Sequence, residues 1–397
     1  MIHKATFWLL FVKLLQYFLA IDAEIPAVIV FGDSSVDTGN NNELSTILRS
    51  NFEPYGRDFF GGKPTGRFSN GRLPSDFISE AFGLKPVVPA FLNPNYKIDD
   101  FATGVCFASA GTGYDNATSD TLVSLLTSKE NANILLSLQI LDSIVHNYNM
   151  QSVLPLWKEV EYYKQYQQQL RDYLGDDRAN TILEEAVYLI SIGTNDFLEN
   201  YYARHKRRLE FSIEEYQNFL IGIASDFIKD LYNLGARRIS LGGLPPMGCL
   251  PLERTRNIMF KRQCIEEYNQ VAREFNMKLA NLVDRLNTEL KGIQLLLSNP
   301  YDILLEMIQN PSSFGKIFSL KTERIWMLNF LFSGFDNADV GCCATGYLEM
   351  GYMCDQLNPF TCKDADKYVF WDAFHPTERT NGLVAAHLMK KWSTKFL

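Results

Sequence analysis

Basic residues, histidines and long apolar runs are all scarce in this sequence of 397 residues. Lysine and arginine number 38 against 46 aspartates and glutamates, which gives a formal net charge of −8. A chain with this charge is a poor ligand for polyanions, so we expect no nucleic-acid partner. After residue 23 no apolar run approaches the roughly 20 residues that cross a bilayer, so we expect no transmembrane segment.

Two patterns that mark phosphate and metal sites are also missing. The sequence has no G-x-x-x-x-G-K-[S/T] phosphate loop, although residues 109–113 are rich in glycine. A calcium loop that starts at Asp33 fails, because Thr38 stands where glycine is needed and Leu44 where glutamate is needed. We therefore expect no metal and no organic cofactor.

The N-terminus has the composition of a secretory signal. Lys4 precedes an apolar core at residues 5–20, and Ala23 is a small residue suited to cleavage. A membrane anchor is the alternative, but the core is short and is interrupted by polar side chains. We interpret residues 1–23 as a signal peptide and expect a secreted, extracellular protein.

The seven cysteines fit a secreted chain, in which disulfides are expected. Six of them fall into two groups, Cys249 with Cys264 and a C-terminal set of Cys342, Cys343, Cys354 and Cys362. We expect the first group to form one disulfide and the second group two, with each adjacent cysteine reaching Cys354 or Cys362. Zinc binding is the competing interpretation, but the C-terminal set has no C-x-x-C pair. Cys106 is left over and is predicted to be a buried free thiol.

Apolar strands alternate with helical patterns along the chain. The predicted strands are 27–31, 186–192, 238–241 and 293–297, and the predicted helices include 74–82, 157–182, 212–234 and 262–291. This alternation predicts an α/β fold with a parallel sheet and helices on both faces. Because no repeat or low-complexity linker divides the chain, we expect residues 24–397 to form a single domain. Asn116 begins its one glycosylation sequon, N-A-T.

Gly32-Asp33-Ser34-Ser35 follows the first predicted strand. Glycine permits a sharp turn, and Asp33 and Ser34 are favourable residues at a helix N-terminus. Open α/β sheets bind ligands at the carboxyl edge of their strands, where Ser34 would lie. A capping serine with no chemical role is the alternative for this segment alone.

A candidate general base for Ser34 lies near the C-terminus. Pro376 disfavours helix for the preceding His375, which is therefore predicted to lie on a loop at a helix entrance. Asp372, three residues upstream, can accept the Nδ1–H of the imidazole. A serine hydroxyl needs such a base to attack an ester.

An oxyanion formed in this reaction needs hydrogen-bond donors. The backbone N–H groups of Ser34 and Gly111 and the side-chain amide of Asn195 are the candidates, because each follows an apolar segment. Acyl transfer is thus the chemistry that these residues suit.

With these pieces the sequence resembles the GDSL esterases/lipases of the SGNH hydrolase superfamily, in their plant-type secreted form. The resemblance rests on V-F-G-D-S-S-V-D-T-G-N-N (30–41), F-A-S-A-G-T-G (107–113), I-G-T-N-D-F (192–197), G-L-P-P-M-G-C-L-P (243–251) and W-D-A-F-H-P-T-E (371–378). It implies a flavodoxin-like three-layer α/β/α sandwich. It also implies that Ser34 is the nucleophile, that Asp372 and His375 complete the catalytic set, and that Gly111 and Asn195 are oxyanion donors.

The sequence departs from the family pattern in three places. Cys106 stands where relatives often have asparagine, and residues 123–151 and 316–334 interrupt segments that are continuous in relatives. We interpret both stretches as insertions from incorrect gene modelling and expect them outside the sandwich. A genuine lid over the active site is the alternative.

The sequence therefore predicts a secreted serine esterase or lipase that hydrolyses small-molecule or lipid esters. An acyltransferase would use the same residues with an alcohol in place of water. A non-catalytic binding protein on the same scaffold is the third hypothesis.

Overall fold

The computed structural model describes residues 25–120, 153–204, 206–315, 321–322, 325–326, 334–392 and 395–396. The predicted signal peptide (1–23) and the first suspected insertion (123–151) lie outside the described residues. Of the second (316–334), only Gly334 and a short antiparallel pair are described, namely β6 (Lys321–Thr322) and β7 (Ile325–Trp326). The interpretation of both stretches as insertions stays a prediction.

A five-stranded parallel sheet forms the centre of the fold. Its strands are β1 (Val28–Gly32), β2 (Gly104–Cys106), β3 (Val187–Ser191), β4 (Arg238–Gly242) and β5 (Gln294–Ser298). They lie in the order β2-β1-β3-β4-β5, and all neighbouring pairs are parallel. This is the flavodoxin-like order, so the predicted fold class is confirmed.

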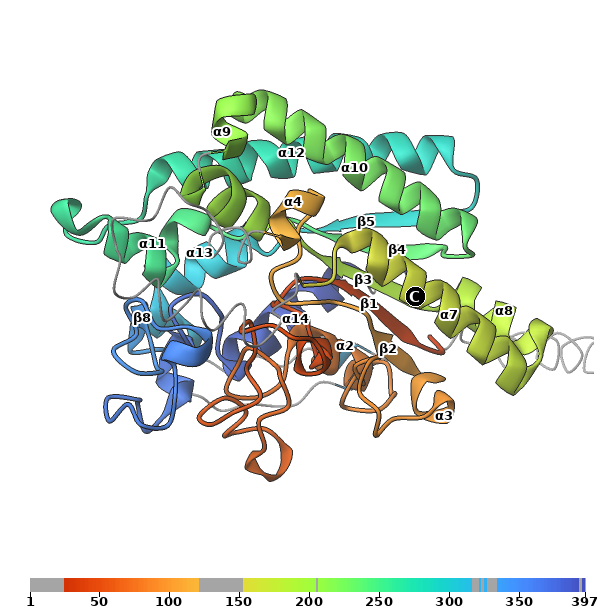
Figure 1. Ribbon diagram of the computed structural model, residues 1–397, viewed down its shortest axis with the longest axis horizontal. Coiled ribbons are helices and arrows are strands. Elements are labelled where there is room, and N and C mark those ends of the chain that lie inside the picture. Colours follow the sequence, from red (N-terminus) through yellow and green to blue (C-terminus); the bar gives the residue numbers. More distant parts are fainter. Residues whose placement is uncertain are drawn as a thin grey trace, which may run out of the picture.

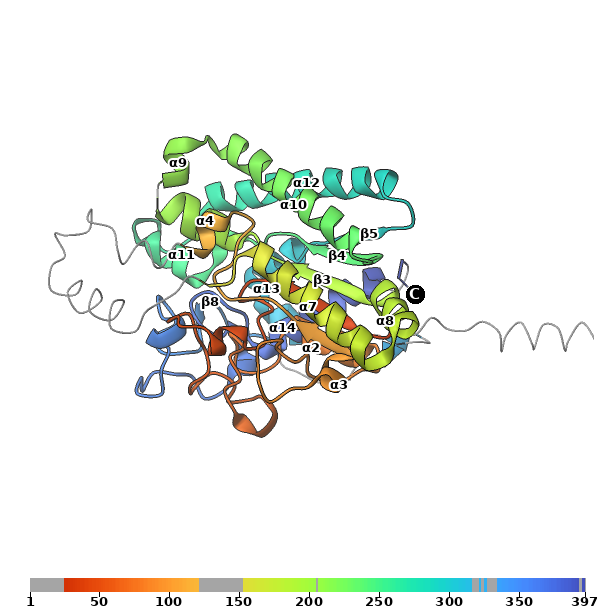
Figure 2. The ribbon, with the colours of Figure 1, turned by 45° about the vertical axis from the view of Figure 1, so that its right-hand side comes forward.

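Helices cover both faces of the sheet. They are α2 (Pro74–Ala81), α3 (Ile98–Phe101), α4 (Asn116–Ser119), α7 (Leu156–Leu174), α8 (Asp176–Glu185), α9 (Lys206–Glu210), α10 (Ile213–Asn233), α11 (Pro251–Arg256), α12 (Glu266–Glu289), α13 (Tyr301–Gln309) and α14 (Glu378–Trp392). Figures 1 and 2 show α10 and α12 above the sheet and α2 and α14 below it. All five residues of β1 are buried, as expected for a parallel strand with helices on both sides.

Short helical segments complete the chain trace. They are η1 (Asn40–Glu43), η2 (Phe60–Gly62), η4 (Asp196–Ala203, a π-helix), η5 (Met247–Cys249), η6 (Ile258–Phe260), η7 (Pro311–Gly315), η8 (Gly351–Met353) and η9 (Ala365–Lys367).

Helix ends follow the local sequence, with one departure from expectation. The helix predicted over 157–182 is split into α7 and α8, because Gly175 adopts a φ of +80° and ends α7. The predicted helix over 212–234 is α10. It begins with a capping box in which the N–H of Glu215 donates to the Ser212 hydroxyl at 3.3 Å.

All six grouped cysteines form disulfides, as predicted. The pairs are Cys249–Cys264, Cys342–Cys362 and Cys343–Cys354. Cys106 is buried and free, in accord with its predicted state. Burial raises the pKa of its thiol to about 12, so it stays protonated and unreactive.

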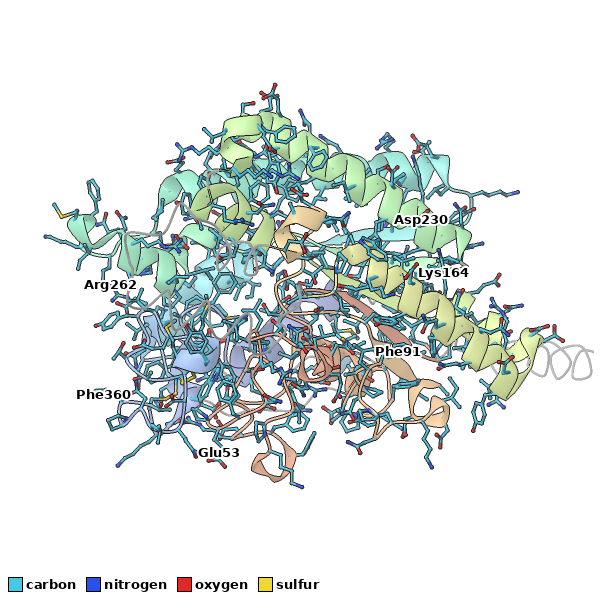
Figure 3. All side chains as sticks on the ribbon, in the orientation of Figure 1. Glu53, Phe91, Lys164, Asp230, Arg262 and Phe360 are labelled. Atoms are coloured by element: carbon cyan, nitrogen blue, oxygen red, sulfur yellow. A yellow bond between two sulfur atoms is a disulfide. The ribbon has the colours of Figure 1, made fainter. Side chains whose placement is uncertain are left out.

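The C-terminal disulfides lie in a second, smaller core beside the main sheet. The segment that forms this core includes the parallel strand pair β8 (Asn337–Gly341) and β9 (Tyr368–Phe370). Four cysteines pack there with Tyr55, Phe68 and Trp371. In Figure 3 the yellow disulfide bonds of this region lie near the labelled Phe360. This second core joins an N-terminal loop to the segment that carries Asp372 and His375.

Candidate active site

Ser34 lies in a sharp turn directly after β1. The turn requires glycine at Gly32, whose φ is +140° and where an added Cβ would lie 1.9 Å from the carbonyl oxygen of Ser191. The N–H of Asp33 donates to that same oxygen at 3.0 Å. Because Ser34 directly follows β1, it lies at the carboxyl edge of the sheet, beside β3. Its side chain is 7% exposed.

Where Asp33 and Ser34 were predicted to suit a helix N-terminus, the chain after β1 makes a single helical turn. The N–H of Asp37 donates to the carbonyl oxygen of Asp33 at 3.0 Å. The Asp33 carboxylate accepts the N–H and the hydroxyl of Ser35, at 2.9 and 2.7 Å. The Asp37 carboxylate then accepts the N–H groups of Gly39 and Asn40, both at 2.8 Å, and these bonds end the turn.

A buried glutamate on α7 supports the same turn. Oε2 of Glu159 accepts the N–H of Gly32 at 2.9 Å, while Oε1 has no hydrogen-bond partner among the described residues. Burial raises the pKa of Glu159 well above its ordinary range, and the carboxylates of Asp37 and Asp33 act in the same direction. Burial therefore favours the neutral form of the Glu159 carboxyl.

We expect Glu159→Gln to stabilise the protein at about pH 9 and to leave its melting temperature nearly unchanged at about pH 4, below the ordinary glutamate pKa. The raised pKa means that the wild type is fully stabilised below the ordinary glutamate range and loses stability as the pH rises. Glutamine mimics the neutral acid at every pH and has no such loss. Melting curves at both pH values measure this, with the exposed Glu161→Gln as control. An equal difference at both pH values would contradict it.

His375 lies on the loop between β9 and α14, as predicted. The loop is tight, because the N–H of Trp371 donates to the carbonyl oxygen of His375 at 2.7 Å. Nε2 of His375 lies 2.8 Å from Oγ of Ser34, and Nδ1 lies 2.8 Å from Oδ2 of Asp372. The structure thus brings Ser34, His375 and Asp372 into one hydrogen-bonded line across 341 residues of sequence separation.

Asp372 is fully buried and accepts several donors. Its Oδ1 accepts the backbone N–H groups of Phe374 and His375, at 2.8 and 2.6 Å. These bonds fix the carboxylate toward the imidazole, so that Nδ1–H donates to Asp372 and Nε2 is free to accept from Ser34.

Sequence reasoning missed Tyr55, which also contacts Asp372. Its hydroxyl donates to Oδ2 of Asp372 at 2.7 Å, and the ring is fully buried. No signal in a single sequence relates two residues that are 317 positions apart.

Gly111 and Asn195 lie in the loops after β2 and β3, the two strands that flank β1. Gly111 adopts a φ of +93°, which favours glycine. The side-chain amide of Asn195 donates to the carbonyl oxygen of Thr112 at 3.0 Å and is 6% exposed. The two loops therefore contact each other.

A second group of hydrogen bonds, all accepted by the Asp196 carboxylate, joins these loops. Its carboxylate accepts the N–H groups of Tyr114 and Asp115, at 2.8 and 3.0 Å, and the hydroxyl of Thr118, at 2.6 Å. Burial raises the pKa of Asp196 to about 7, although all three donors favour its carboxylate. Thr118 belongs to the N-A-T sequon, whose Asn116 is exposed at the start of α4.

A cavity opens beside Ser34 and His375. It extends from the loop after β4 to α13 and α14. Apolar side chains form much of its wall, among them Pro246, Leu250, Leu304, Ile308, Phe374 and Val384. An apolar chain attached to a carbonyl at Ser34 could lie in this space.

Within the described ranges, no group of three or more histidine, cysteine, aspartate or glutamate side chains is arranged to hold a metal ion. The helices in the same part of the chain are all too short or too polar to cross a bilayer.

Comparison with known proteins identifies the family of this chain. The family model of the GDSL-like lipase/acylhydrolases matches residues 28–388. GDSL esterase/lipase At4g26790 of Arabidopsis thaliana is 56% identical over 374 residues, which cover 94% of this chain and 93% of the relative. GDSL esterase/lipase At2g04570 of the same plant is 52% identical and covers 99% of both chains. The chain therefore belongs to the GDSL-like lipase/acylhydrolase family.

Proposed function

We propose that this protein hydrolyses carboxylic esters through an acyl-enzyme formed on Ser34. The observation that carries the proposal is the hydrogen-bonded line from Ser34 through His375 to Asp372. The two Arabidopsis relatives are named esterases/lipases, which agrees with this chemistry.

His375 acts as the general base in the first half of the reaction. Its Nε2 takes the proton of the Ser34 hydroxyl as Oγ attacks the ester carbonyl. The protonated imidazole then gives this proton to the departing alcohol. In the second half, His375 activates a water molecule that releases the acid from Ser34. Asp372 orients the ring and stabilises its positive charge, and it does not take the proton.

The negative charge on the carbonyl oxygen needs donors that are already in place. The N–H groups of Ser34 and Gly111 and the Nδ2–H of Asn195 fit this role, because their loops follow three adjacent strands. One Nδ2–H of Asn195 already donates to Thr112, which holds the amide in a fixed position. Removing a single such donor typically lowers kcat by about 10²–10³-fold.

The acyl part of the ester is proposed to lie in the apolar cavity beside Ser34. Each methylene group that leaves water there contributes about 0.8 kcal/mol to binding. Esters of medium-chain acids should therefore be better substrates than acetates.

Val384→Phe fills part of this cavity, since Val384 lies in its wall. We expect kcat/KM for p-nitrophenyl octanoate to fall about tenfold relative to p-nitrophenyl acetate. Val283→Phe is the matched control, because both valines are 7% exposed and Val283 lies on α12. If both variants kept the wild-type ratio of octanoate to acetate turnover, the acyl chain would have to bind elsewhere.

The direct test of the function is a reaction with a fluorophosphonate followed by peptide mapping. Modification of Ser34, with parallel loss of p-nitrophenyl ester hydrolysis, is the expected result. Modification of Ser35 or of no serine would contradict the assignment.

Secretion is part of the same proposal. The three disulfides fit an oxidising compartment, in agreement with the signal-like composition of residues 1–23. Asn116 is exposed and is the proposed glycosylation site.

A further inference from the structure

We propose that Tyr55 is a positioning residue for the catalytic reaction, acting through Asp372 on His375. The inference rests on the roles proposed above for these two residues. The Tyr55 hydroxyl donates to Oδ2 of Asp372 at 2.7 Å and accepts the N–H of Gly351 at 2.8 Å. Both hydrogen-bonding functions of the hydroxyl are thus used in one fixed arrangement.

Tyr55 completes the set of donors around the buried carboxylate. Oδ1 of Asp372 accepts the backbone N–H groups of Phe374 and His375. Among the described residues Oδ2 accepts two side chains, the imidazole Nδ1–H at 2.8 Å and the Tyr55 hydroxyl at 2.7 Å, and Nδ1 also lies 3.0 Å from Oδ1. Without Tyr55, Oδ2 would keep the imidazole alone of these two partners and would carry a larger share of the negative charge.

The surroundings keep Tyr55 neutral and immobile. Burial, reinforced by the Asp372 carboxylate, raises the pKa of Tyr55 well above its ordinary range, so the hydroxyl remains a donor at all working pH values. Phe52, Phe68 and Trp371 contact its ring edge-to-face, with centroids 5.7, 5.9 and 6.1 Å away.

The position of the hydroxyl also depends on a disulfide loop. Gly351 lies between Cys343 and Cys354, which are bonded to each other. Its N–H therefore presents a fixed donor to the oxygen of Tyr55. Successive hydrogen bonds thus connect the disulfide loop to Tyr55, Tyr55 to Asp372, and Asp372 to His375.

Loss of the hydroxyl has two expected effects on His375. The carboxylate keeps its backbone donors at Oδ1 but loses one of the two donors at Oδ2, so it is held less firmly against Nδ1–H and fewer molecules have the imidazole in place. Oδ2 also carries more charge, which favours the protonated imidazole that cannot act as a base. The activity should therefore begin to fall at a higher pH on the acid side.

Tyr55→Phe tests this with the loss of one oxygen atom. We expect kcat for p-nitrophenyl acetate to fall at least about tenfold, as for a hydrogen bond to a charged group, while KM stays near the wild-type value. We also expect the acid side of the kcat/KM profile to move to higher pH. The far-downfield proton resonance of the imidazole Nδ1–H should shift, which gives a readout independent of turnover.

Tyr166→Phe is the matched control, because its hydroxyl is equally buried and donates to the carbonyl oxygen of Phe101 at 3.1 Å. It should keep the wild-type pH profile and proton resonance even if its melting temperature falls. Other charged groups near the site, Asp33 and the Arg57 guanidinium over Trp371, are present in both variants. Differences between the variants therefore report the Tyr55 hydroxyl.

The outcomes separate this inference from the proposed function. A wild type that hydrolyses esters through Ser34, with a Tyr55→Phe variant of unchanged kcat, pH profile and resonance, would overturn the role of Tyr55 alone. An activity loss in Tyr55→Phe that only follows a lower melting temperature would also overturn it. A wild type without esterase activity and without Ser34 labelling would overturn both.

Discussion

We expect Ser34→Ala to lower kcat/KM for a soluble p-nitrophenyl ester by about 10⁶-fold, the loss typical of a removed serine nucleophile. The variant lacks the only atom that can form the acyl-enzyme in the proposed mechanism. The turn around position 34 should persist, because Gly32, Asp33 and Ser35 hold it through backbone and carboxylate bonds. Initial rates with a chromogenic ester measure the loss of activity, and a melting curve tests whether the variant keeps its fold.

Ser35→Ala is the control for this experiment. Ser35 is the neighbouring serine, and its hydroxyl bonds to Asp33 and to Ser191 at 2.7 and 2.8 Å. Its loss should affect stability more than turnover. Comparable losses of activity in both variants, with both still folded, would leave Ser34 without a special role.

The second large effect is expected at the base and its partner. His375→Ala should be nearly as harmful as Ser34→Ala, whereas Asp372→Asn should lower kcat by about 10⁴-fold. Asparagine can present an N–H to Nδ1, which favours the wrong tautomer, but the imidazole itself remains. Because the residues act as a unit, the double variant Ser34→Ala with His375→Ala should be no worse than either single variant.

His387→Ala provides the control, since this histidine lies on α14 away from the hydrogen-bonded line. It should keep wild-type kcat and the wild-type pH profile. In the wild type, the activity should decline as the pH falls, because a protonated imidazole cannot take the Ser34 proton. An Asp372→Asn variant that is more impaired than His375→Ala would contradict the assigned roles.

The sequence was informative where a role depends on neighbouring residues. Ser34 could be predicted because an apolar strand, a glycine and a capping residue stand next to it. His375 and Asp372 could be placed together because they are only three positions apart and Pro376 follows. Four of the five strands of the sheet were found for the same reason, since their apolar runs are continuous, whereas the three-residue strand β2 was not predicted.

Features that depend on distant residues could not be predicted. Tyr55 binds a carboxylate far along the chain, and Glu159 supports a turn 127 positions away. The split at Gly175 was missed because glycine within a helical pattern does not reveal whether its φ will be positive. The choice between Cys354 and Cys362 as partner of Cys343 depends on how the loop folds over Tyr55.

With the role proposed for Tyr55, the Cys343–Cys354 loop makes correct oxidative folding a condition for full activity. The four C-terminal cysteines can pair in three ways, and only the native pairing encloses Gly351 between Cys343 and Cys354. A molecule with the two pairs exchanged would contain the same number of disulfides but would present Gly351 to Tyr55 in another way. The specific activity of a preparation would therefore depend on the disulfide-isomerase capacity of the host. Total thiol content would not distinguish active molecules from mispaired ones.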